Sequence, residues 1–186
     1  MTGRPTNTDT LLLCVDMQPV FLRAIADAAR VQRRCEFAIA AATGLGLPVA
    51  FTEQVPKKLG PTAPELLVLA PGAAVFAKDT FSALADDTVR DGLLRARGVE
   101  HVLLCGIETP VCIYQTTIDA LAAGIQITLL SDCLGARRSE DAASCLAELT
   151  RAGAHVLPSE TVFYSMLRDV KHPFFKAYTQ LVKTHG

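Results

Sequence analysis

Three side chains capable of acid–base or nucleophilic chemistry each follow an apolar run of the sequence. The run LLLCVD ends on Asp16, AAVFAK ends on Lys78, and HVLLCG leads through GIETP to Cys112. In open α/β sheets, functional groups gather just beyond the carboxyl ends of the strands. If these runs are strands, a carboxylate, an ammonium and a thiol lie at one edge of the sheet. Each also has a structural alternative: a turn or cap for Asp16, a solvated charge for Lys78 and core packing for Cys112.

The residues around Cys112 favour a reactive thiol over a packed one. Thr109 can act as a helix N-cap and Pro110 suits the first helical position, which puts Cys112 in the first turn. This helix is predicted over residues 109–123 and ends at Gly124. The positive end of the helix and a nearby Lys78 ammonium would both stabilise a thiolate. We therefore expect the pKa of Cys112 to fall from its usual value of about 8.5 toward neutrality.

A nucleophilic thiol also needs a proton acceptor, and the histidines are poorly placed for that task. Two are near the carboxyl terminus and two precede or enter strands at the opposite end of the sheet: His172, His185, His101 and His155. Asp16 is therefore the better candidate base. A carboxylate raises the pKa of a neighbouring thiol, and Lys78 between the two groups would offset that repulsion.

The other cysteines have no comparable setting. Cys14 and Cys105 fall inside predicted strands, Cys35 and Cys145 inside predicted helices, and Cys133 in the loop after a strand. No C-x-x-C pair and no histidine at zinc-finger spacing is present, so the sequence predicts reduced thiols that pack in the core.

The elements that must position the three groups alternate along the chain as β-α units. Short apolar runs predict strands over residues 11–16, 48–52, 74–77, 102–105, 126–130 and 154–156. Helical periodicity predicts further helices over 31–42, 86–97 and 139–152, each followed by glycine. The segment 52–66 carries three prolines and a glycine, which favours a loop over the site. The expected fold is a three-layer, Rossmann-like α/β domain over residues 1–186, with a six-stranded, mostly parallel sheet and helices on both faces.

Composition excludes several classes of function. The formal net charge is −1 over 186 residues, so nothing attracts nucleic acid or an anionic membrane, and a ribonuclease is disfavoured. The amino-terminal MTGRPTNTDT lacks the features of a secretory signal or transit peptide, and no window reaches membrane-spanning length. We expect a cytoplasmic protein that acts on a small molecule. A dinucleotide-binding module is disfavoured because no glycine-rich turn follows the first strand.

Three motifs together resemble the isochorismatase-like cysteine hydrolases, the superfamily of nicotinamidases and N-carbamoylsarcosine amidases. They are VDMQPVF (15–21), AKDTFSAL (77–84) and GIETPVC (106–112), and the match covers nearly the whole chain in order and spacing. The resemblance implies Asp16 as base, Lys78 as electrostatic partner and Cys112 as nucleophile. It also implies a cis peptide between Ile107 and Glu108, with the backbone amides of Glu108 and Cys112 forming an oxyanion hole.

The departures from the superfamily pattern narrow the expectation. Nicotinamidases carry an Asp-x-His metal-binding pattern after the second strand, where this chain has FTEQVPKKLG, so we expect no metal and no cofactor. Cys112 separates the chain from isochorismatases proper, and the chain is most similar to uncharacterised isochorismatase-domain proteins. Gln18 and Phe21 match family positions that line the pocket, while Gln54 and Thr109 are further candidates for substrate binding.

Two hypotheses of function follow. The first is a metal-independent cysteine hydrolase that cleaves a small amide or related C–N bond through a Cys112 thioester. The second is a catalytically weak or inactive oligomeric scaffold or binding protein that retains the hydrolase fold, motivated by the aromatic and aliphatic carboxyl-terminal segment KHPFFKAYTQLVKTHG, whose packing partner is the core or another subunit. The resemblance implies a homo-oligomer under either hypothesis.

Overall fold

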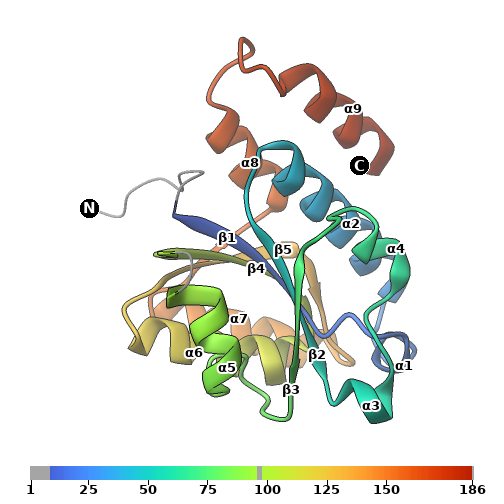
Figure 1. Cartoon of the computed structure of the whole chain (residues 1–186), viewed down its shortest axis with the longest axis vertical. Helices are drawn as coiled ribbons and strands as arrows, with labels where there is room; N and C mark the ends of the chain where they lie inside the picture. Colours follow the sequence, from blue (N-terminus) through green and yellow to red (C-terminus); the bar gives the residue numbers. More distant parts are fainter. Residues whose placement is uncertain (1–8, 96–97, 186) are drawn as a thin grey trace.

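The computed structural model describes residues 9–95 and 98–185 and has one six-stranded sheet (Figure 1). The strands are β1 (Thr10–Val15), β2 (Val49–Gln54), β3 (Ala74–Lys78), β4 (His101–Ile107), β5 (Gln126–Gly135) and β6 (His155–Leu157). Their spatial order is β3-β2-β1-β4-β5-β6, and every neighbouring pair is parallel. The strand order therefore reverses between β1 and β4, the switch point where open α/β sheets bind their ligands.

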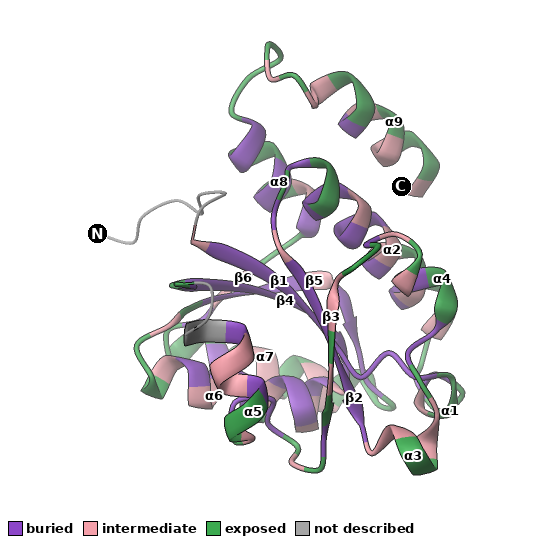
Figure 2. Cartoon of the chain, in the orientation of Figure 1, coloured by how far each residue is buried: buried purple, intermediate pink, exposed green. Residues whose placement is uncertain are grey.

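Helices cover both faces of the sheet, as the sequence predicts (Figures 1 and 2). On one face lie α2 (Ala28–Gly44), α4 (Pro64–Leu67) and α8 (Ser159–Leu167), with α9 (Phe175–His185) packed against α2. On the other lie α5 (Asp87–Arg90), α6 (Tyr114–Ala122) and α7 (Ser139–Arg151). The short helices α1 (Pro19–Leu22) and α3 (Pro56–Leu59) follow the ends of β1 and β2.

The central strand β1 shows why the sheet is buried on both faces. Leu12 and Cys14 pack under α2, whereas Leu11, Leu13 and Val15 pack toward the opposite helices. Because successive side chains of a strand point to opposite faces, an uninterrupted apolar run suits a strand covered on both sides.

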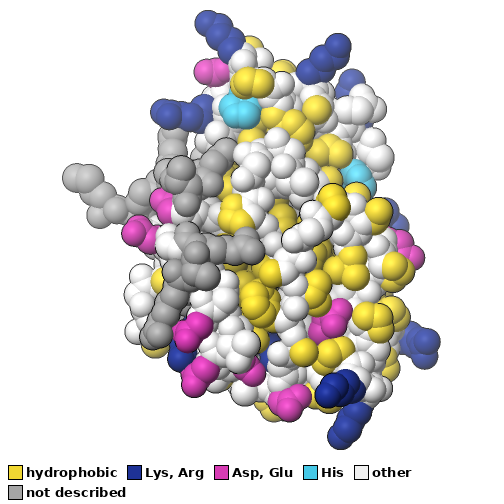
Figure 3. Space-filling model, viewed as in Figure 1, with side chains coloured by type: hydrophobic (Ala, Val, Ile, Leu, Met, Phe, Trp, Pro, Cys, Tyr) yellow, Lys and Arg dark blue, Asp and Glu magenta, His cyan; other side chains and the backbone are white. Residues whose placement is uncertain are grey.

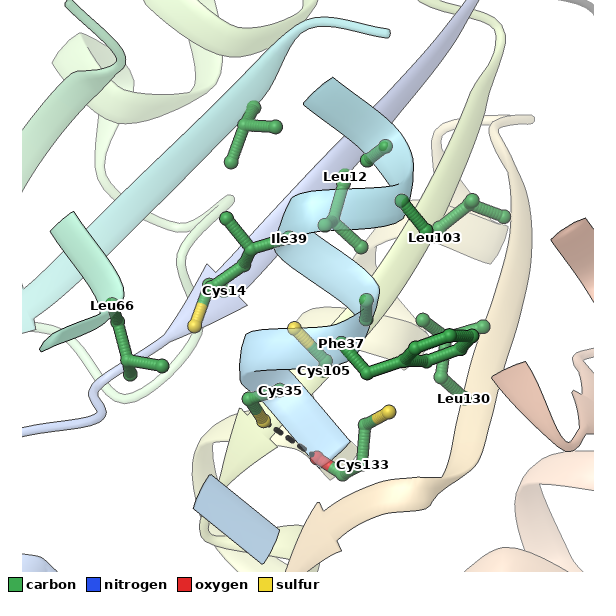
Figure 4. Close-up of a cluster of buried hydrophobic side chains, with 14 of the residues drawn as sticks. Leu12, Cys14, Cys35, Phe37, Ile39, Leu66, Leu103, Cys105, Leu130 and Cys133 are labelled. Carbon is green, nitrogen blue, oxygen red and sulfur yellow. Dashed lines mark hydrogen bonds between the residues drawn. The ribbon is translucent and has the colours of Figure 1, made fainter. Parts of the chain in front are cut away.

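Four cysteines fill the core under α2 and are fully buried: Cys14, Cys35, Cys105 and Cys133 (Figure 4). Cys14 and Cys105 face each other across β1 and β4, and the Cys35 thiol donates to the Cys133 carbonyl over 3.3 Å. The neighbouring Cys105 thiol, followed by burial, raises the pKa of Cys35 well above its usual range, as expected for packed thiols. Cys145 differs, because it is partly exposed on α7.

Several strands extend beyond the ends predicted from sequence, and the extensions of β2 and β5 change the assignment of residues discussed above. β2 continues to Gln54, so this residue belongs to the strand and not to the following loop. β5 continues from Leu130 to Gly135, so the prediction of a loop at Cys133 was wrong. Apolar periodicity missed both extensions because the added residues include polar side chains. Glu53 in β2 is buried, and Asp132 in β5 is partly buried.

Segment 55–66 is tied to the sheet edge by polar contacts. The Gln18 amide donates to the Gly60 carbonyl over 2.6 Å, and the Thr62 backbone N–H donates to the Glu53 carboxylate over 2.7 Å. Pro56 and Pro64 start the single turns α3 and α4, where a missing N–H costs nothing. The segment therefore forms a fixed wall beside the end of β2.

The predicted helix over 86–97 has a different form. It begins as α5, with the Asp86 carboxylate accepting the Val89 backbone N–H over 3.0 Å, and continues as a π-helical stretch, Asp91–Arg95. Residues 96–97 lie outside the described part of the chain.

The carboxyl-terminal aromatic residues pack on the chain's own core. Tyr178 of α9 is fully buried, and its ring centroid lies 5.7 Å from that of Phe37 on α2. Arg34 holds the end of α9, since it donates to the His185 carbonyl over 3.1 Å and lies 4.5 Å above the Phe37 ring. Among the described helices, none is long and apolar enough to cross a membrane.

His101 makes the stability of the fold dependent on pH. It is buried at the amino-terminal end of β4, with Nε2 2.8 Å from the Thr128 hydroxyl, and burial followed by the charge of His155 lowers its pKa to about 4. The unfolded chain binds this proton near pH 6.5, so the free energy of unfolding should fall as the pH drops from 6.5 to 4, by up to about 3 kcal/mol. Urea unfolding of wild type and His101→Gln at several pH values tests this. An equally steep pH dependence in the variant would assign it to other groups.

Candidate active site

The sheet brings Asp16, Lys78 and Cys112 together at the switch point. Lys78 Nζ lies 2.7 Å from Asp16 Oδ2 and 3.9 Å from Cys112 Sγ. All three residues are buried: Asp16 and Lys78 are 1% and 2% exposed, and Cys112 is 7% exposed. The strand-end rule that singled out these residues therefore predicted their proximity correctly.

Close packing of β1 against β4 shapes the backbone at this point. Asp16 follows β1 with a φ of 52°, an uncommon left-handed conformation for a residue other than glycine. Gly106 of β4 has a φ of 113°, and a Cβ there would lie 2.2 Å from the Val15 carbonyl oxygen. Only glycine fits such an approach, so Gly106 allows β1 and the turn carrying Cys112 to come this close.

The Asp16 carboxylate is held at both oxygens. Oδ1 accepts the Thr52 hydroxyl over 2.8 Å, and Oδ2 accepts from Lys78. Thr52 lies beside Val15 on the neighbouring strand β2, so its direction is set by the sheet. These contacts fix the carboxylate in one orientation beside the thiol.

Lys78 commits its ammonium protons to oxygen. Besides Asp16, Nζ donates to Gln54 Oε1 over 2.6 Å and to the carbonyls of Thr80 and Phe81, both over 3.1 Å. A lysine ammonium has three protons, and these oxygen contacts are all shorter than its approach to sulfur. Lys78 therefore acts on Cys112 mainly through its charge.

Cys112 lies in the first turn of a helix, as predicted, although that turn has another form. It is a π-helical turn, Thr109–Ile113, that continues into α6. The predicted N-cap role of Thr109 was wrong: Glu108 occupies the cap position, and the Thr109 hydroxyl donates to the Gly135 carbonyl over 2.9 Å. π-Helical turns are rare and often mark functional sites.

The resting Cys112 is a neutral thiol, contrary to the expected low pKa. Burial, followed by the Asp16 carboxylate, raises the pKa of Cys112 to about 12. The Lys78 charge and the Glu108 backbone act in the opposite direction without overcoming them. Sequence reasoning underestimated desolvation, and it also missed that Lys78 is much closer to Asp16 than to the sulfur.

A cavity of about 370 Å³ opens above these residues and has a mostly apolar wall. Its lining comprises Asp16, Phe21, Ala24, Ile25, Gln54, Phe81, Ile107, Glu108, Val111, Cys112 and Arg137. Two of the residues expected to bind substrate, Phe21 and Gln54, are in this lining. The size suits a small molecule.

Gln18 and Thr109 are close to the cavity but do not line it. The Gln18 amide pairs with the backbone of Gln54: Oε1 accepts the Gln54 N–H over 2.7 Å, and Nε2 donates to the Gln54 carbonyl over 3.1 Å. Gln54 in turn donates to the Asp79 carbonyl over 3.0 Å while its oxygen accepts from Lys78. Gln18 thus supports the residue that supports Lys78.

Glu108 connects the turn that carries Cys112 to the end of β5. The peptide bond between Ile107 and Glu108 is cis, as the resemblance implies. The Glu108 carboxylate accepts from Arg137 Nε over 3.0 Å at each oxygen, and from the Arg137 backbone N–H over 3.2 Å. Together with the contact between Thr109 and Gly135, these bonds fix the position of the turn.

Sequence reasoning missed Thr52, Phe81 and Arg137. Thr52 was the predicted last residue of a strand, so the strand-end rule could have found it. Arg137 lies just beyond the true end of β5, but the prediction ended this strand at residue 130. Phe81 follows β3 in the loop after Lys78, is 56% exposed and has no comparable signal. Within the described residues, no cluster of three or more His, Cys, Asp or Glu side chains could hold a metal ion.

The buried pair of Asp16 and Lys78 should be strongly coupled in stability. Lys78→Met leaves an uncompensated buried carboxylate and should lower the free energy of unfolding by about 3–5 kcal/mol. The double variant Asp16→Asn/Lys78→Met removes both charges and should be more stable than Lys78→Met alone. Urea unfolding of both single variants and the double variant measures this coupling, and additive losses would contradict it.

Comparisons with known proteins agree with this fold. The sequence model of the Isochorismatase domain matches residues 10–161. Isochorismatase domain-containing protein 2 of Xenopus laevis is 34% identical over 180 residues, which cover 97% of this chain and 86% of that protein. The structure of MAR1 ribonuclease from Caenorhabditis elegans superposes with a TM-score of 0.90 at 31% identity, over 97% of this chain and 93% of that one.

A third similarity concerns the fold alone. The structure of the YcaC gene product of Escherichia coli, described as an octameric hydrolase of unknown specificity, has a TM-score of 0.91 at 22% identity over 100% of this chain and 92% of that one. A domain match over most of the chain, with relatives above 30% identity along nearly all of it, shows that this protein belongs to the isochorismatase family.

Proposed function

We propose that this protein is a cysteine hydrolase that cleaves a small amide or related C–N bond without a metal. The observation that carries the proposal is the set of Asp16, Lys78 and Cys112 in contact at the bottom of a small, mostly apolar cavity. Each has a distinct role: Cys112 attacks, Asp16 moves the proton, and Lys78 holds Asp16 and offsets negative charge.

The first half of the reaction forms a thioester. Asp16 accepts the Cys112 proton while Sγ forms a bond to the carbonyl carbon of the substrate. The oxyanion that develops is held by the backbone N–H groups of Glu108 and Cys112, a type of contact worth about 3 kcal/mol of barrier for each donor. The C–N bond then breaks, and the proton on Asp16 passes to the departing nitrogen.

The second half restores the enzyme. Asp16 removes a proton from water, the hydroxide attacks the thioester carbonyl, and the C–S bond breaks to release a carboxylic acid. The thiolate then takes back the proton held on Asp16. Lys78 transfers no proton in either half, which agrees with its full set of oxygen partners.

The high pKa of the resting Cys112 thiol is consistent with a mechanism in which Asp16 removes the proton while the sulfur attacks the substrate carbonyl. A free thiolate need not accumulate, because Asp16 lies beside the sulfur and can accept its proton as the S–C bond forms. Burial and the neighbouring carboxylate keep Cys112 protonated until a carbonyl group arrives.

A thioester intermediate can be trapped with hydroxylamine. Incubation of the enzyme with a panel of small amides and ureides, plus hydroxylamine, should yield hydroxamates in addition to ammonia or amine. Cys112→Ala should abolish both products, whereas Cys145→Ala, which changes a partly exposed thiol on α7, should leave them unchanged. Colorimetric hydroxamate detection and mass spectrometry measure the outcome.

Release of amine without any hydroxamate would argue against the thioester. If the whole panel is inert and Cys112→Ala retains the cellular function, the scaffold hypothesis is favoured instead. Homo-oligomerisation is part of the proposal under both hypotheses, supported by the octameric description of the Escherichia coli structure. Light scattering coupled to size-exclusion chromatography measures it directly.

The rate at which iodoacetamide alkylates Cys112 should distinguish the effect of the Asp16 charge from that of the Lys78 charge. Asp16→Asn removes the carboxylate that raises the pKa of the thiol, so alkylation at pH 8 should become faster even though hydrolysis is lost. Lys78→Met removes the opposing charge and should slow alkylation. Labelling of Cys145 in the same sample gives the internal control. Slower alkylation in Asp16→Asn would mean that the carboxylate activates the resting thiol, contrary to its pKa.

The ribonuclease named in the Caenorhabditis elegans relative does not lead us to propose RNA as the substrate. The cavity is small, and Arg137 is the one basic residue in its lining. Lys78 is buried below the cavity and pairs with Asp16. On the face seen in Figure 3, Lys and Arg side chains are scattered around the edge of the molecule and form no continuous patch. Single-stranded RNA binders instead combine a basic groove with stacking aromatic residues.

A further inference from the structure

A second hollow adjoins the cavity above Cys112. It is a groove of about 450 Å³ with a mostly apolar wall, formed by the loop after β3 and by α6, and we call it the β3–α6 groove. Phe81 belongs to the lining of both the groove and the cavity. Phe81 is 56% exposed, but its backbone carbonyl accepts from Lys78 Nζ over 3.1 Å. The Phe81 ring therefore separates the groove from the cavity at a point that is fixed to the triad.

The β3–α6 groove carries negative charge that the rest of the chain does not compensate. Asp79 and Asp119 are in its lining, and none of the described residues that line it is basic. Within the described part of the chain, neither carboxylate takes part in a hydrogen bond or an ion pair. Phe81 and Tyr114 add aromatic rings, whose faces attract cations. The groove is therefore complementary to an apolar chain that ends in a positive charge.

The strand order puts this groove on the side of the leaving nitrogen. In the proposed mechanism that nitrogen takes its proton from Asp16, which is held by Lys78 of β3 and Thr52 of β2. The amides that hold the oxyanion belong to the turn after β4, on the other side of β1 in the sheet. Oxygen and nitrogen project from the carbonyl carbon in different directions. A substituent on the nitrogen therefore extends toward the loop after β3, where Phe81 separates the two hollows.

We propose that the β3–α6 groove binds the leaving group, and that the substrate is a secondary amide whose nitrogen carries an alkyl chain with a terminal ammonium group. Hydrolysis adds the hydroxyl group of water to the acyl carbon and, through Asp16, one proton to the nitrogen, so the products are a carboxylic acid and a diamine. This proposal rests on the proposed function, because it takes the Cys112 thioester reaction as its chemistry. Asp79 and Asp119 determine specificity and take no part in bond breaking.

Glu65 supplies a matched control for charge. It is an exposed carboxylate in the first turn of α4, which packs on the opposite face of the sheet from α6. It is absent from the lining of both the groove and the cavity. A general attraction of cations to acidic side chains would depend on Glu65 as well, whereas binding in the groove depends on Asp79 and Asp119.

The test measures binding to Cys112→Ala protein, so that its outcome is independent of any activity of the thiol. Hexanamides whose nitrogen carries a propyl to hexyl chain ending in an ammonium group are compared by calorimetry with the same amides ending in a hydroxyl group. We expect the ammonium series to bind roughly tenfold more tightly at the best chain length, as charge-assisted hydrogen bonds provide. Added Asp79→Asn and Asp119→Asn together should remove this preference, and added Glu65→Gln should leave it intact.

A variant that fills the groove tests where the chain lies. Ala85 is exposed and lines the groove but not the cavity, so added Ala85→Phe should weaken binding of both substituted series relative to unsubstituted hexanamide. Undiminished binding of the ammonium series in this variant would overturn the proposal, because its chain would then lie elsewhere.

Three further outcomes would contradict it: equal affinity of the ammonium and hydroxyl series, an equal loss of preference in Glu65→Gln, or no binding by either series. Failure here is distinct from failure of the proposed function. If neither series binds while primary amides still yield hydroxamates through Cys112, the cysteine hydrolase stands and the leaving-group proposal falls alone.

Discussion

The buried ion pair between Asp16 and Lys78 is the interaction on which the site depends. Two charges this far from solvent are tolerated only when each is paired and its remaining hydrogen-bonding capacity is satisfied. Here the Thr52 hydroxyl donates a hydrogen bond to Asp16, and Lys78 donates hydrogen bonds to Gln54 and to two backbone carbonyls. Because these partners come from β1, β2, β3 and the loop after β3, the pair can form only when that half of the sheet is assembled.

The same pair determines how the thiol behaves. Because Lys78 pairs with Asp16, its positive charge is partly neutralised where it could act on Cys112. Burial therefore keeps the sulfur protonated. Two glutamines support this arrangement. Gln18 accepts a hydrogen bond from the Gln54 backbone N–H, and the Gln54 side chain accepts one from Lys78. In the proposed mechanism, this arrangement gives a preorganised base beside a protonated thiol, which suits chemistry that begins only when a carbonyl carbon is present.

Sequence alone predicted the sheet, the two covered faces and the contact of Asp16, Lys78 and Cys112, because apolar runs and strand ends are local patterns with direct spatial meaning. It could not predict properties that depend on tertiary packing. The pKa of Cys112 depends on burial by residues far along the chain, and Thr109 found a partner in Gly135 that no local rule could supply. Arg137 was missed for a related reason, since the partly buried polar residues Ser131 and Asp132 interrupt the apolar run of β5.

The extension of β5 has a consequence for how this architecture can diversify. Its last residues pair with the end of β4, Gly106 with Leu134 and Ile107 with Gly135, beyond the register shift between the two strands. Position 137 therefore lies two residues beyond a strand end whose backbone is fixed by hydrogen bonds, in the three-residue connection that leads into α7. Within such a frame, a substitution at position 137 changes one side chain of the cavity lining and leaves the paired backbone of the strand ends in place.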